Sequence, residues 1–250
     1  MLSDEQYLRY AAQIATATVG EHGQQALARA QVTVVGLGGL GCAAAHYLAG
    51  AGIGRLTLLD ADVVQLSNLQ RQTLYSTADV GHAKADCAAK RLAAVNPTIS
   101  LQAMQQRVTA ANVCQLLSGS DLVLDCTDNL ASRYLINDQC YALGIPLLSA
   151  AAEGMNGQLL CLHPQHAHGC YQCLYPSGVQ QSAACERVGV VGAVVGMMGT
   201  LQALQAVKVL TGTEVEWGKL FLFDGLNLSW QSLNLPRSVQ CPRCGGNDGN

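Results

Sequence analysis

Charge is scarce in this chain. Only 12% of its 250 residues are charged, and 17 acidic residues nearly balance 14 basic ones. Proteins that bind nucleic acid or an anionic membrane carry basic patches, so this composition argues against both as default partners. So little charge also indicates that much of the surface is covered, and we expect a second copy of the chain to cover it in a homodimer.

No secretory signal is recognisable, because the opening MLSDEQYLRYAAQ carries acidic residues and has no apolar core. The longest run without a charged residue or a histidine, residues 188–207, is long enough to suggest a membrane span. It contains polar side chains, and its glycines at positions 189, 192, 196 and 199 share one helical face, where another backbone could approach closely. We therefore predict a buried or interface helix, no membrane span and a cytoplasmic location.

A disulfide framework is not indicated either. The eleven cysteines are an odd number, and several lie in apolar runs, where a thiol acts as a small buried hydrophobe. In the reducing cytoplasm that we expect, stable disulfides are rare. The cysteines in apolar runs are Cys42, Cys87, Cys126, Cys140 and Cys161.

The chain does have a regular alternation of apolar strands and helical segments. This alternation predicts an α/β fold with a Rossmann-like, doubly wound and mainly parallel sheet. After residue 156 the pattern changes to one typical of a C-terminal antiparallel extension. We expect strands over 31–36, 55–60, 99–104, 121–128, 146–151, 157–162, 219–225 and 228–235, and helices over 43–52, 83–95 and 132–144.

A glycine-rich turn follows the first strand. Gly36, Gly38 and Gly41 form G-x-G-x-x-G, which permits a tight turn and brings backbone N–H groups at a helix start close to phosphate. Asp60 ends the next strand, where an acid can bind ribose hydroxyls. Together these residues predict a nucleotide site, for which NAD or FAD is the default ligand.

The segment after Asp60 argues against a dinucleotide. Cations beside phosphates, such as Arg71 and Lys84, stabilise the charge that develops when a triphosphate is attacked, whereas a hydride carrier needs an apolar shelf. Asp128 follows a strand at the sheet edge where ligands bind, and its carboxylate can hold Mg²⁺. We therefore favour ATP, with solvated surface charge as the alternative role of the two cations. The polar segment contains Asn68, Arg71 and Gln72.

Two Cys-x-x-Cys pairs predict a metal site. Four thiolates suit tetrahedral Zn²⁺ in a closed, structural site, which would pin the C-terminal segment to the body of the protein. A redox-active pair is the alternative, and three nearby histidines, which we interpret as loop residues, could compete as ligands. The pairs are Cys170–Cys173 and Cys241–Cys244, and the histidines are His163, His166 and His168.

Cys185 has no such partner. It lies near Arg187 in a segment with few apolar residues, and a nearby cation lowers the pKa of a thiol and favours the thiolate. We interpret Cys185 as a nucleophile in an exposed loop that a large acyl group can reach. A spare surface cysteine is the alternative.

Five features occurring in this order resemble the ThiF/MoeB/HesA family of adenylyltransferases, the bacterial relatives of ubiquitin-activating enzymes. They are RYAAQI, VVGLGGLGC, LSNLQRQTL, LDCTDN and the two cysteine pairs, and the resemblance covers essentially the whole chain. It implies that ATP adenylates the C-terminal glycine of a ubiquitin-like sulfur carrier ending in Gly-Gly, with release of pyrophosphate. A sulfurtransferase or a cysteine desulfurase is a further implied partner.

The resemblance also implies residue roles. Carboxylate attack on a phosphate brings two anions together, so clamped cations and alignment supply most of the catalysis, and no general base is required. Cys185 would be linked to the carrier through sulfur, and the four paired cysteines would bind Zn²⁺. Gly39 and Asp60 would contact the nucleotide, Asn68, Arg71 and Lys84 the phosphates, and Asp128 would hold Mg²⁺.

The resemblance divides the chain into regions and favours one branch of the family. We expect N-terminal helices over 1–30, a nucleotide-binding region over 31–155, and a carrier- and zinc-binding region over 156–250 with a crossover loop at about 174–188. The segments QQRVT, CLYP and LFDG are more similar to the thiamine branch than to the molybdopterin branch. Adenylation of the molybdopterin-synthase small subunit, a poorly catalytic carrier-binding scaffold and an NAD-dependent oxidoreductase are the alternatives.

One position departs from the family pattern. Ala12 stands where the family usually has a second arginine, which in relatives reaches the ATP of the other subunit. A methyl group cannot replace that charge, so we expect adenylation to be reduced.

Overall fold

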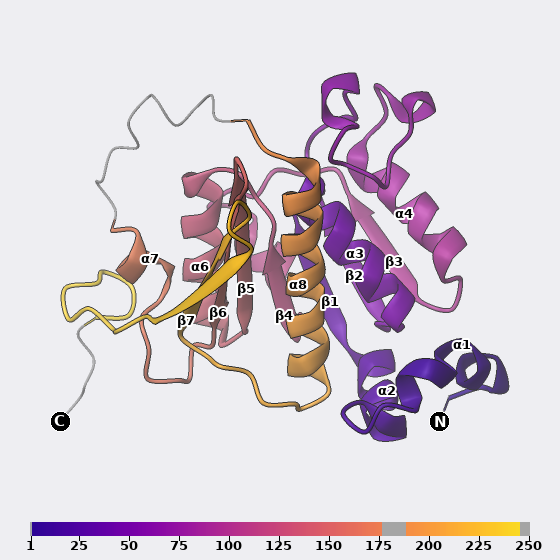
Figure 1. The fold of residues 1–250 in the computed structure, drawn as a ribbon, viewed down its shortest axis with the longest axis horizontal. Coiled ribbons are helices and arrows are strands. Elements are labelled where there is room, and N and C mark those ends of the chain that lie inside the picture. Colours follow the sequence, from indigo (N-terminus) through magenta and orange to yellow (C-terminus); the bar gives the residue numbers. More distant parts are fainter. Residues whose placement is uncertain (1, 177–188, 246–250) are drawn as a thin grey trace.

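The computed structural model describes residues 2–176 and 189–245, and its centre is one eight-stranded sheet of order β3-β2-β1-β4-β5-β6-β7-β8 (Figure 1). Neighbouring strands from β3 to β5 pair in parallel, and those from β5 to β8 pair antiparallel. The predicted fold class is therefore confirmed. The strands are β1 (Gln31–Val35), β2 (Arg55–Leu59), β3 (Ser100–Met104), β4 (Leu122–Asp125), β5 (Leu147–Glu153), β6 (Asn156–Leu162), β7 (Lys219–Asp224) and β8 (Ser229–Asn234).

Helices cover both faces of the parallel strands. Successive side chains of a strand point to opposite faces, and on these strands apolar side chains on both faces are buried. Val34 of β1 packs in one apolar cluster with α3, α4 and α8, whereas the next residue, Val35, packs in a second cluster with α5 and α6. The helices are α1 (Asp4–Ile14), α2 (Gly20–Arg29), α3 (Gly39–Ala51), α4 (Lys84–Val95), α5 (Val113–Leu117), α6 (Leu130–Leu143), α7 (Tyr171–Leu174) and α8 (Gly192–Leu210), with 3₁₀ turns η1 (Leu66–Asn68) and η2 (Thr77–Asp79).

The predicted glycine face allows close approach at only two of its four positions, and Gly189 precedes α8 rather than lying in it. A Cβ on Gly199 would lie 2.3 Å from the Leu40 carbonyl oxygen, and one on Gly192 would lie 2.6 Å from that of Gln70. Gly189 and Gly196 have open space instead. The approaching backbones therefore belong to the same chain, and Figure 1 shows α3 beside α8.

Among the described residues, α8 is the one helix long and apolar enough to cross a membrane. In the structure it packs on α3 and on strands β4, β5 and β6. Its side chains Val194, Met198 and Ala203 are buried in the larger apolar cluster. Helix α8 is therefore part of the apolar core on one face of the sheet.

The N-terminal helices pack against the core at one end. Ser3 and Gln6 cap α1 reciprocally, and the ring of Tyr10 fills the space beside Gly52, where a Cβ would approach it to 2.5 Å. Ala12 is exposed on this helix. The predicted boundary between residues 155 and 156 falls in the turn between β5 and β6, within the continuous sheet, and the functional division into regions stays a prediction.

Candidate functional site

A cavity of about 1190 Å³ opens at the carboxyl ends of the parallel strands and extends to β8. This is the edge at which open α/β sheets bind ligands. The structure brings most of the predicted nucleotide residues together there. Those in the cavity wall are Gly36, Gly38, Gly39, Asp60, Arg71, Gln72, Lys84 and Asp128.

The glycine turn leaves no room for most side chains. Gly36 has φ +89°, and a Cβ on it would lie 2.8 Å from the Cys126 carbonyl oxygen. Gly41 lies outside the cavity wall, and its Cβ would be 1.9 Å from the Gly36 carbonyl oxygen, so it serves the close packing of the turn on α3. Gly38 alone of the motif opens toward a side chain, that of Gln72 at 3.7 Å.

Gly39 is confined by two other segments. A Cβ there would approach a methyl group of Val195 on α8 to 2.4 Å and the carbonyl oxygen of Arg71 to 3.0 Å. Gly192, in the first turn of α8, meets the same segment at Gln70. Three segments are therefore in close contact: the glycine turn, the segment that carries Arg71 and the start of α8.

Asp60 braces the glycine turn from the end of β2. Its Oδ2 accepts the Leu37 N–H at 2.7 Å, and its Oδ1 accepts the Asp62 N–H at 2.8 Å. Burial raises the pKa of the Asp60 carboxyl, although these hydrogen bonds and the charge of Lys84 oppose the shift. The same carboxylate lines the cavity, where it can meet a ribose.

Two cations of the cavity wall are held by a carboxylate that sequence reasoning missed. The Lys84 ammonium, almost fully buried, lies 3.2 Å from Asp62 Oδ2, and the exposed guanidinium of Arg107 lies 3.8 Å from Asp62 Oδ1. Arg107 comes from the QQRVT segment directly after β3, so its place at a strand end was the available signal. The cavity wall therefore carries positive charge from several segments of the chain, and Arg71 is a further source.

Asn68 lies outside the cavity wall. Its Oδ1 accepts a hydrogen bond from Arg71 Nη2 at 2.9 Å, so it orients the guanidinium. Gln72 is buried, and among the described residues no donor reaches its Oε1. A buried amide oxygen without a donor is expected to find one in a bound polar ligand or in water.

Asp128 is exposed in the cavity wall, and a buried polar network holds the loop that carries it. Arg133 donates to the carbonyl oxygens of Thr127 and Ala150, the latter at 3.0 Å. Asp125 accepts from Thr127 Oγ1 at 2.6 Å. Asp128 itself accepts one long hydrogen bond, from Asn129 Nδ2 to Oδ1 at 3.5 Å, so its exposed carboxylate can still bind a cation.

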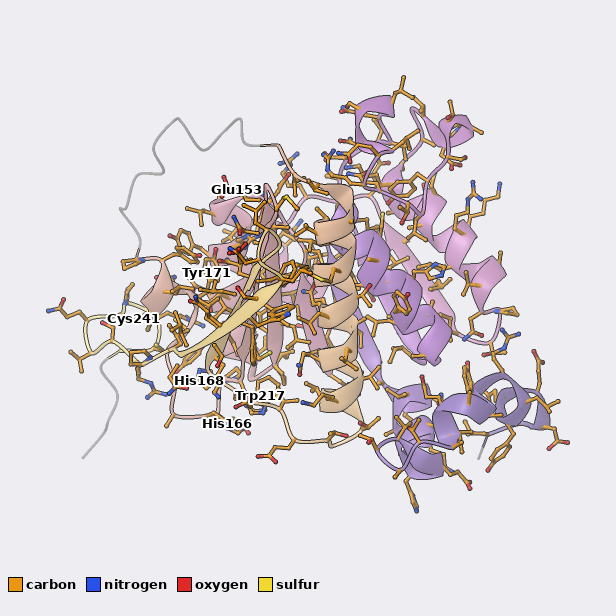
Figure 2. The ribbon with its side chains drawn as sticks, viewed as in Figure 1. Glu153, His166, His168, Tyr171, Trp217 and Cys241 are labelled. Atoms are coloured by element: carbon orange, nitrogen blue, oxygen red, sulfur yellow. The ribbon has the colours of Figure 1, made fainter. Side chains whose placement is uncertain are left out.

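The antiparallel strands and α7 form the far wall of the cavity. Tyr175 Oη donates to Gln158 Oε1 at 2.9 Å, and the ring of Tyr171 lies 5.0 Å from that of Tyr175. Glu153, labelled with Tyr171 in Figure 2, lines the same region. This wall extends the cavity beyond the residues that we assign to a nucleotide.

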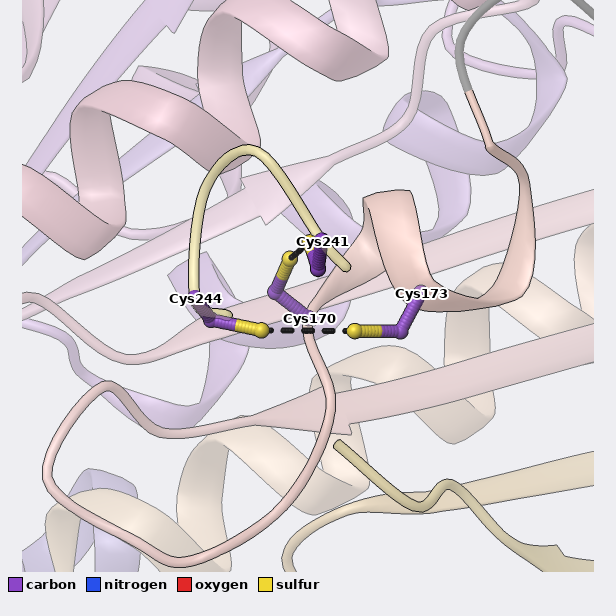
Figure 3. A group of neighbouring side chains, drawn as sticks. All are labelled: Cys170, Cys173, Cys241 and Cys244. Atoms are coloured by element: carbon purple, nitrogen blue, oxygen red, sulfur yellow. Dashed lines mark hydrogen bonds between the residues drawn. The ribbon is translucent and has the colours of Figure 1, made fainter. Parts of the chain in front are cut away.

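The two cysteine pairs converge on one cluster (Figure 3). All four Sγ atoms lie within 4.8 Å of one another, with Cys170 and Cys241 3.6 Å apart and Cys173 and Cys244 3.3 Å apart. None of the four forms a disulfide. Four thiolates about 2.3 Å from a tetrahedral Zn²⁺ would be about 3.8 Å apart, so the cluster fits that ion.

The histidines lie outside this cluster, as expected of loop residues. The rings of His163 and His166 pack at 5.0 and 5.9 Å from the ring of Trp217, and Figure 2 shows His166 and His168 near that tryptophan. Cys185 lies outside the described residues.

Four of the five cysteines in the apolar runs are buried, as predicted. Burial raises the pKa of the Cys42 and Cys161 thiols to about 12, so both stay protonated near neutral pH. Cys126 and Cys140 are also buried, and burial raises their pKa, whereas Cys87 is half-buried. These thiols are parts of the core rather than nucleophiles.

The sequence is similar to that of a known protein family over most of its length. The model of the ThiF family matches residues 10–243. The sulfur carrier protein ThiS adenylyltransferase of Escherichia coli (strain K12) is 49% identical over 247 residues, which cover 99% of this chain and 98% of that protein. The molybdopterin-synthase adenylyltransferase of the same organism is 42% identical over 245 residues, covering 98% of each chain.

A solved structure shares the fold. That of E. coli MccB with succinimide superposes with a TM-score of 0.85 at 21% identity, over 98% of this chain and 75% of that one. At this identity the likeness concerns the fold alone.

Proposed function

The chain belongs to the ThiF family, and on that premise we propose that it uses ATP to adenylate the C-terminal glycine of a ubiquitin-like sulfur carrier. One observation carries the proposal: Arg71, Lys84 and Asp128 lie in the wall of one cavity beside the glycine turn. Such a cavity can neutralise a triphosphate while a second anion approaches it.

The residues divide the work of binding. The turn at Gly38 and the first N–H groups of α3 receive phosphate, and Asp60 binds the ribose. Lys84 and Arg71 balance the phosphate charge. Asp128 would hold Mg²⁺, which supplies further positive charge at the phosphates. The braces from Asn68 to Arg71 and from Asp62 to Lys84 fix both cations in advance, which reduces reorganisation during the reaction.

The reaction needs alignment rather than proton transfer. A carboxylate oxygen of the carrier's terminal glycine forms a bond to the α-phosphorus, the bond from that phosphorus to the bridging oxygen breaks, and pyrophosphate leaves with the electron pair. The carboxylate is already a nucleophile, so no residue has to act as a base. The product is an acyl-adenylate, a reactive anhydride that sulfur can attack.

The exposed strand β8 supports a protein as the second substrate. All its residues are exposed, and Ser229 and Gln231 line the cavity. Trp230 and Leu233 are about half exposed on the same strand. We propose that the carrier docks on this strand and extends its Gly-Gly end into the cavity.

We propose a ThiS-like carrier that serves sulfur transfer to the thiazole of thiamine. The higher identity to the ThiS adenylyltransferase, 49% against 42% for the molybdopterin-synthase enzyme, supports this choice. A sulfurtransferase or a cysteine desulfurase would deliver the sulfur that attacks the adenylate. In this proposal Cys185 is the residue that joins the carrier through sulfur.

We further propose that the four-cysteine cluster holds Zn²⁺ and that the protein acts as a cytoplasmic homodimer without a membrane span. The sulfur spacings support the metal. The low charge and the exposed Leu8 and Leu204 support a covered surface, and the packing of α8 on α3 supports a core role for the apolar helix. Metal analysis and light scattering after size exclusion test these two points.

Pyrophosphate exchange tests the main proposal. We expect labelled pyrophosphate to enter ATP only when a carrier ending in Gly-Gly is present. A carrier shortened by its last glycine is the control and should give no exchange. Exchange with the molybdopterin-synthase small subunit but not with a ThiS-like carrier would reassign the substrate, and absence of exchange with both would contradict the proposal.

A further inference from the structure

Each Cys-x-x-Cys turn has one middle residue that contacts the same turn of α6. Gln172, between Cys170 and Cys173, donates from Nε2 to both carboxylate oxygens of Asp138, at 2.7 and 2.9 Å. Arg243, between Cys241 and Cys244, donates from Nη2 to the backbone carbonyl oxygen of Asp138. One middle residue of each Cys-x-x-Cys turn therefore reaches the same residue.

Neighbouring contacts strengthen this attachment. Asn137 Oδ1 accepts the Tyr171 N–H at 2.9 Å, and Asn137 Nδ2 donates to Asp138 Oδ1 at 2.9 Å. The Arg243 guanidinium also lies over the Tyr141 ring, 5.3 Å from its centre. Gln172 is buried, so its hydrogen bonds to the carboxylate are shielded from water.

We propose that Asp138 is an anchoring residue of the four-cysteine site, which holds the Cys170–Cys173 turn at metal-binding spacing from the Cys241–Cys244 turn. Four thiolates repel one another, and their ordering otherwise has to be driven by the metal. An anchor on a rigid helix lowers that cost and so raises affinity for a thiophilic dication such as Zn²⁺. Partners that orient metal ligands typically contribute 10–100-fold to metal affinity.

The hydrogen bonds predict which substitutions have non-additive effects on metal affinity. Asp138→Ala removes the carboxylate but keeps the backbone carbonyl that Arg243 uses. Asp138→Ala and Gln172→Ala therefore both break the contact between these side chains, and the double variant should bind metal no more weakly than Asp138→Ala alone. Arg243→Ala breaks a separate contact and should add its own loss to that of Asp138→Ala.

The experiment measures metal affinity and release on the full-length protein. Co²⁺ is titrated into reduced, metal-free protein and followed by its thiolate absorption, and Zn²⁺ release to a chromophoric chelator is timed. We expect about 10–100-fold weaker binding for Asp138→Ala and Gln172→Ala. Asp138→Asn, which keeps one acceptor, should fall between. Asp86→Ala, an exposed aspartate on α4, is the matched control and should bind as the unsubstituted protein does.

Metal binding at the unsubstituted level in both single variants would overturn the proposal, as would losses in the two that simply add. Gln172→Ala leaves α6 intact, so it decides the question if Asp138→Ala does not fold, as judged by circular dichroism. Pyrophosphate exchange is measured in parallel on the metal-loaded variants. These readouts are separate, so a failure of the adenylation proposal would leave the metal result standing.

Discussion

Strands β4 and β8 show how the two halves of the sheet differ. All four residues of β4 are buried, whereas all six residues of β8 are exposed. In the parallel half helices cover both faces, so a ligand reaches only the strand ends and the loops that follow them. The antiparallel half exposes a strand beside the same cavity. The difference suggests a division of labour, with a small nucleotide bound by the first half and a protein substrate by the second.

The largest effect should come from Asp128→Ala in the parallel half. Loss of the carboxylate removes the proposed Mg²⁺ ligand, and we expect carrier-dependent pyrophosphate exchange to fall by about a thousandfold. The melting temperature should stay unchanged, because Asp128 is exposed and the buried contacts of its loop come from Asp125 and Arg133.

Asp86→Ala serves again as the control for an exposed aspartate and should exchange normally. Exchange that survives Asp128→Ala at more than a tenth of the original rate would remove this residue from the reaction.

The next largest effect should be a gain in adenylation from Ala12→Arg. This variant tests whether the nucleotide site lacks a positive charge that the family usually has at this position. An arginine at this exposed position of α1 would supply the charge that the family resemblance leads us to expect there. We expect the rate of adenylation to rise by up to about a hundredfold. Ala12→Gln, of similar length without the charge, should not reproduce the gain, and an unchanged rate with arginine would end the idea.

The parallel half was largely predictable from the sequence, because most of its strands are short apolar runs that end at a glycine or an acidic residue. The predicted helix over 83–95 corresponds to α4 at Lys84–Val95. The short helices α5 and α7 were missed, since four or five residues hold too little periodicity to detect.

Within the site, residue types were predictable but contacts were not. Asn68 was expected at the phosphates, which stays a prediction, and its hydrogen bond with Arg71 was not foreseen. Asp62 and Arg107 were missed because their pairing depends on the register of β2 and β3, which bring distant positions to the same sheet edge. The cysteine cluster was predicted from spacing alone, whereas its attachment to Asp138 depends on where α6 lies.

A smaller effect should come from Trp230→Ser in the antiparallel half. Large, half-exposed aromatic residues often contribute most to protein binding, and we expect the KM for the carrier to rise about tenfold. The KM for ATP should not change, because Trp230 lies on the antiparallel edge strand and contacts Phe223 of β7.

Val80→Ser, an exposed apolar residue of the parallel half, is the control. A rise in the KM for ATP with no change for the carrier would contradict the division between the halves.

The smallest effect on exchange should be that of Cys185→Ser. Adenylate formation uses no thiol, so exchange should continue at the unsubstituted rate, while any conjugate joined through sulfur to the carrier disappears on a non-reducing gel. Loss of exchange would instead make this cysteine a structural residue.

The narrow contacts of Gly39 and Gly192 have a mechanical consequence. A Cβ on Gly39 or Gly192 would collide with these neighbours, so the glycine turn, the backbone around Arg71 and the first turn of α8 are in close contact and each resists displacement of the others. Any displacement of Arg71 toward an arriving triphosphate must carry the start of α8 with it.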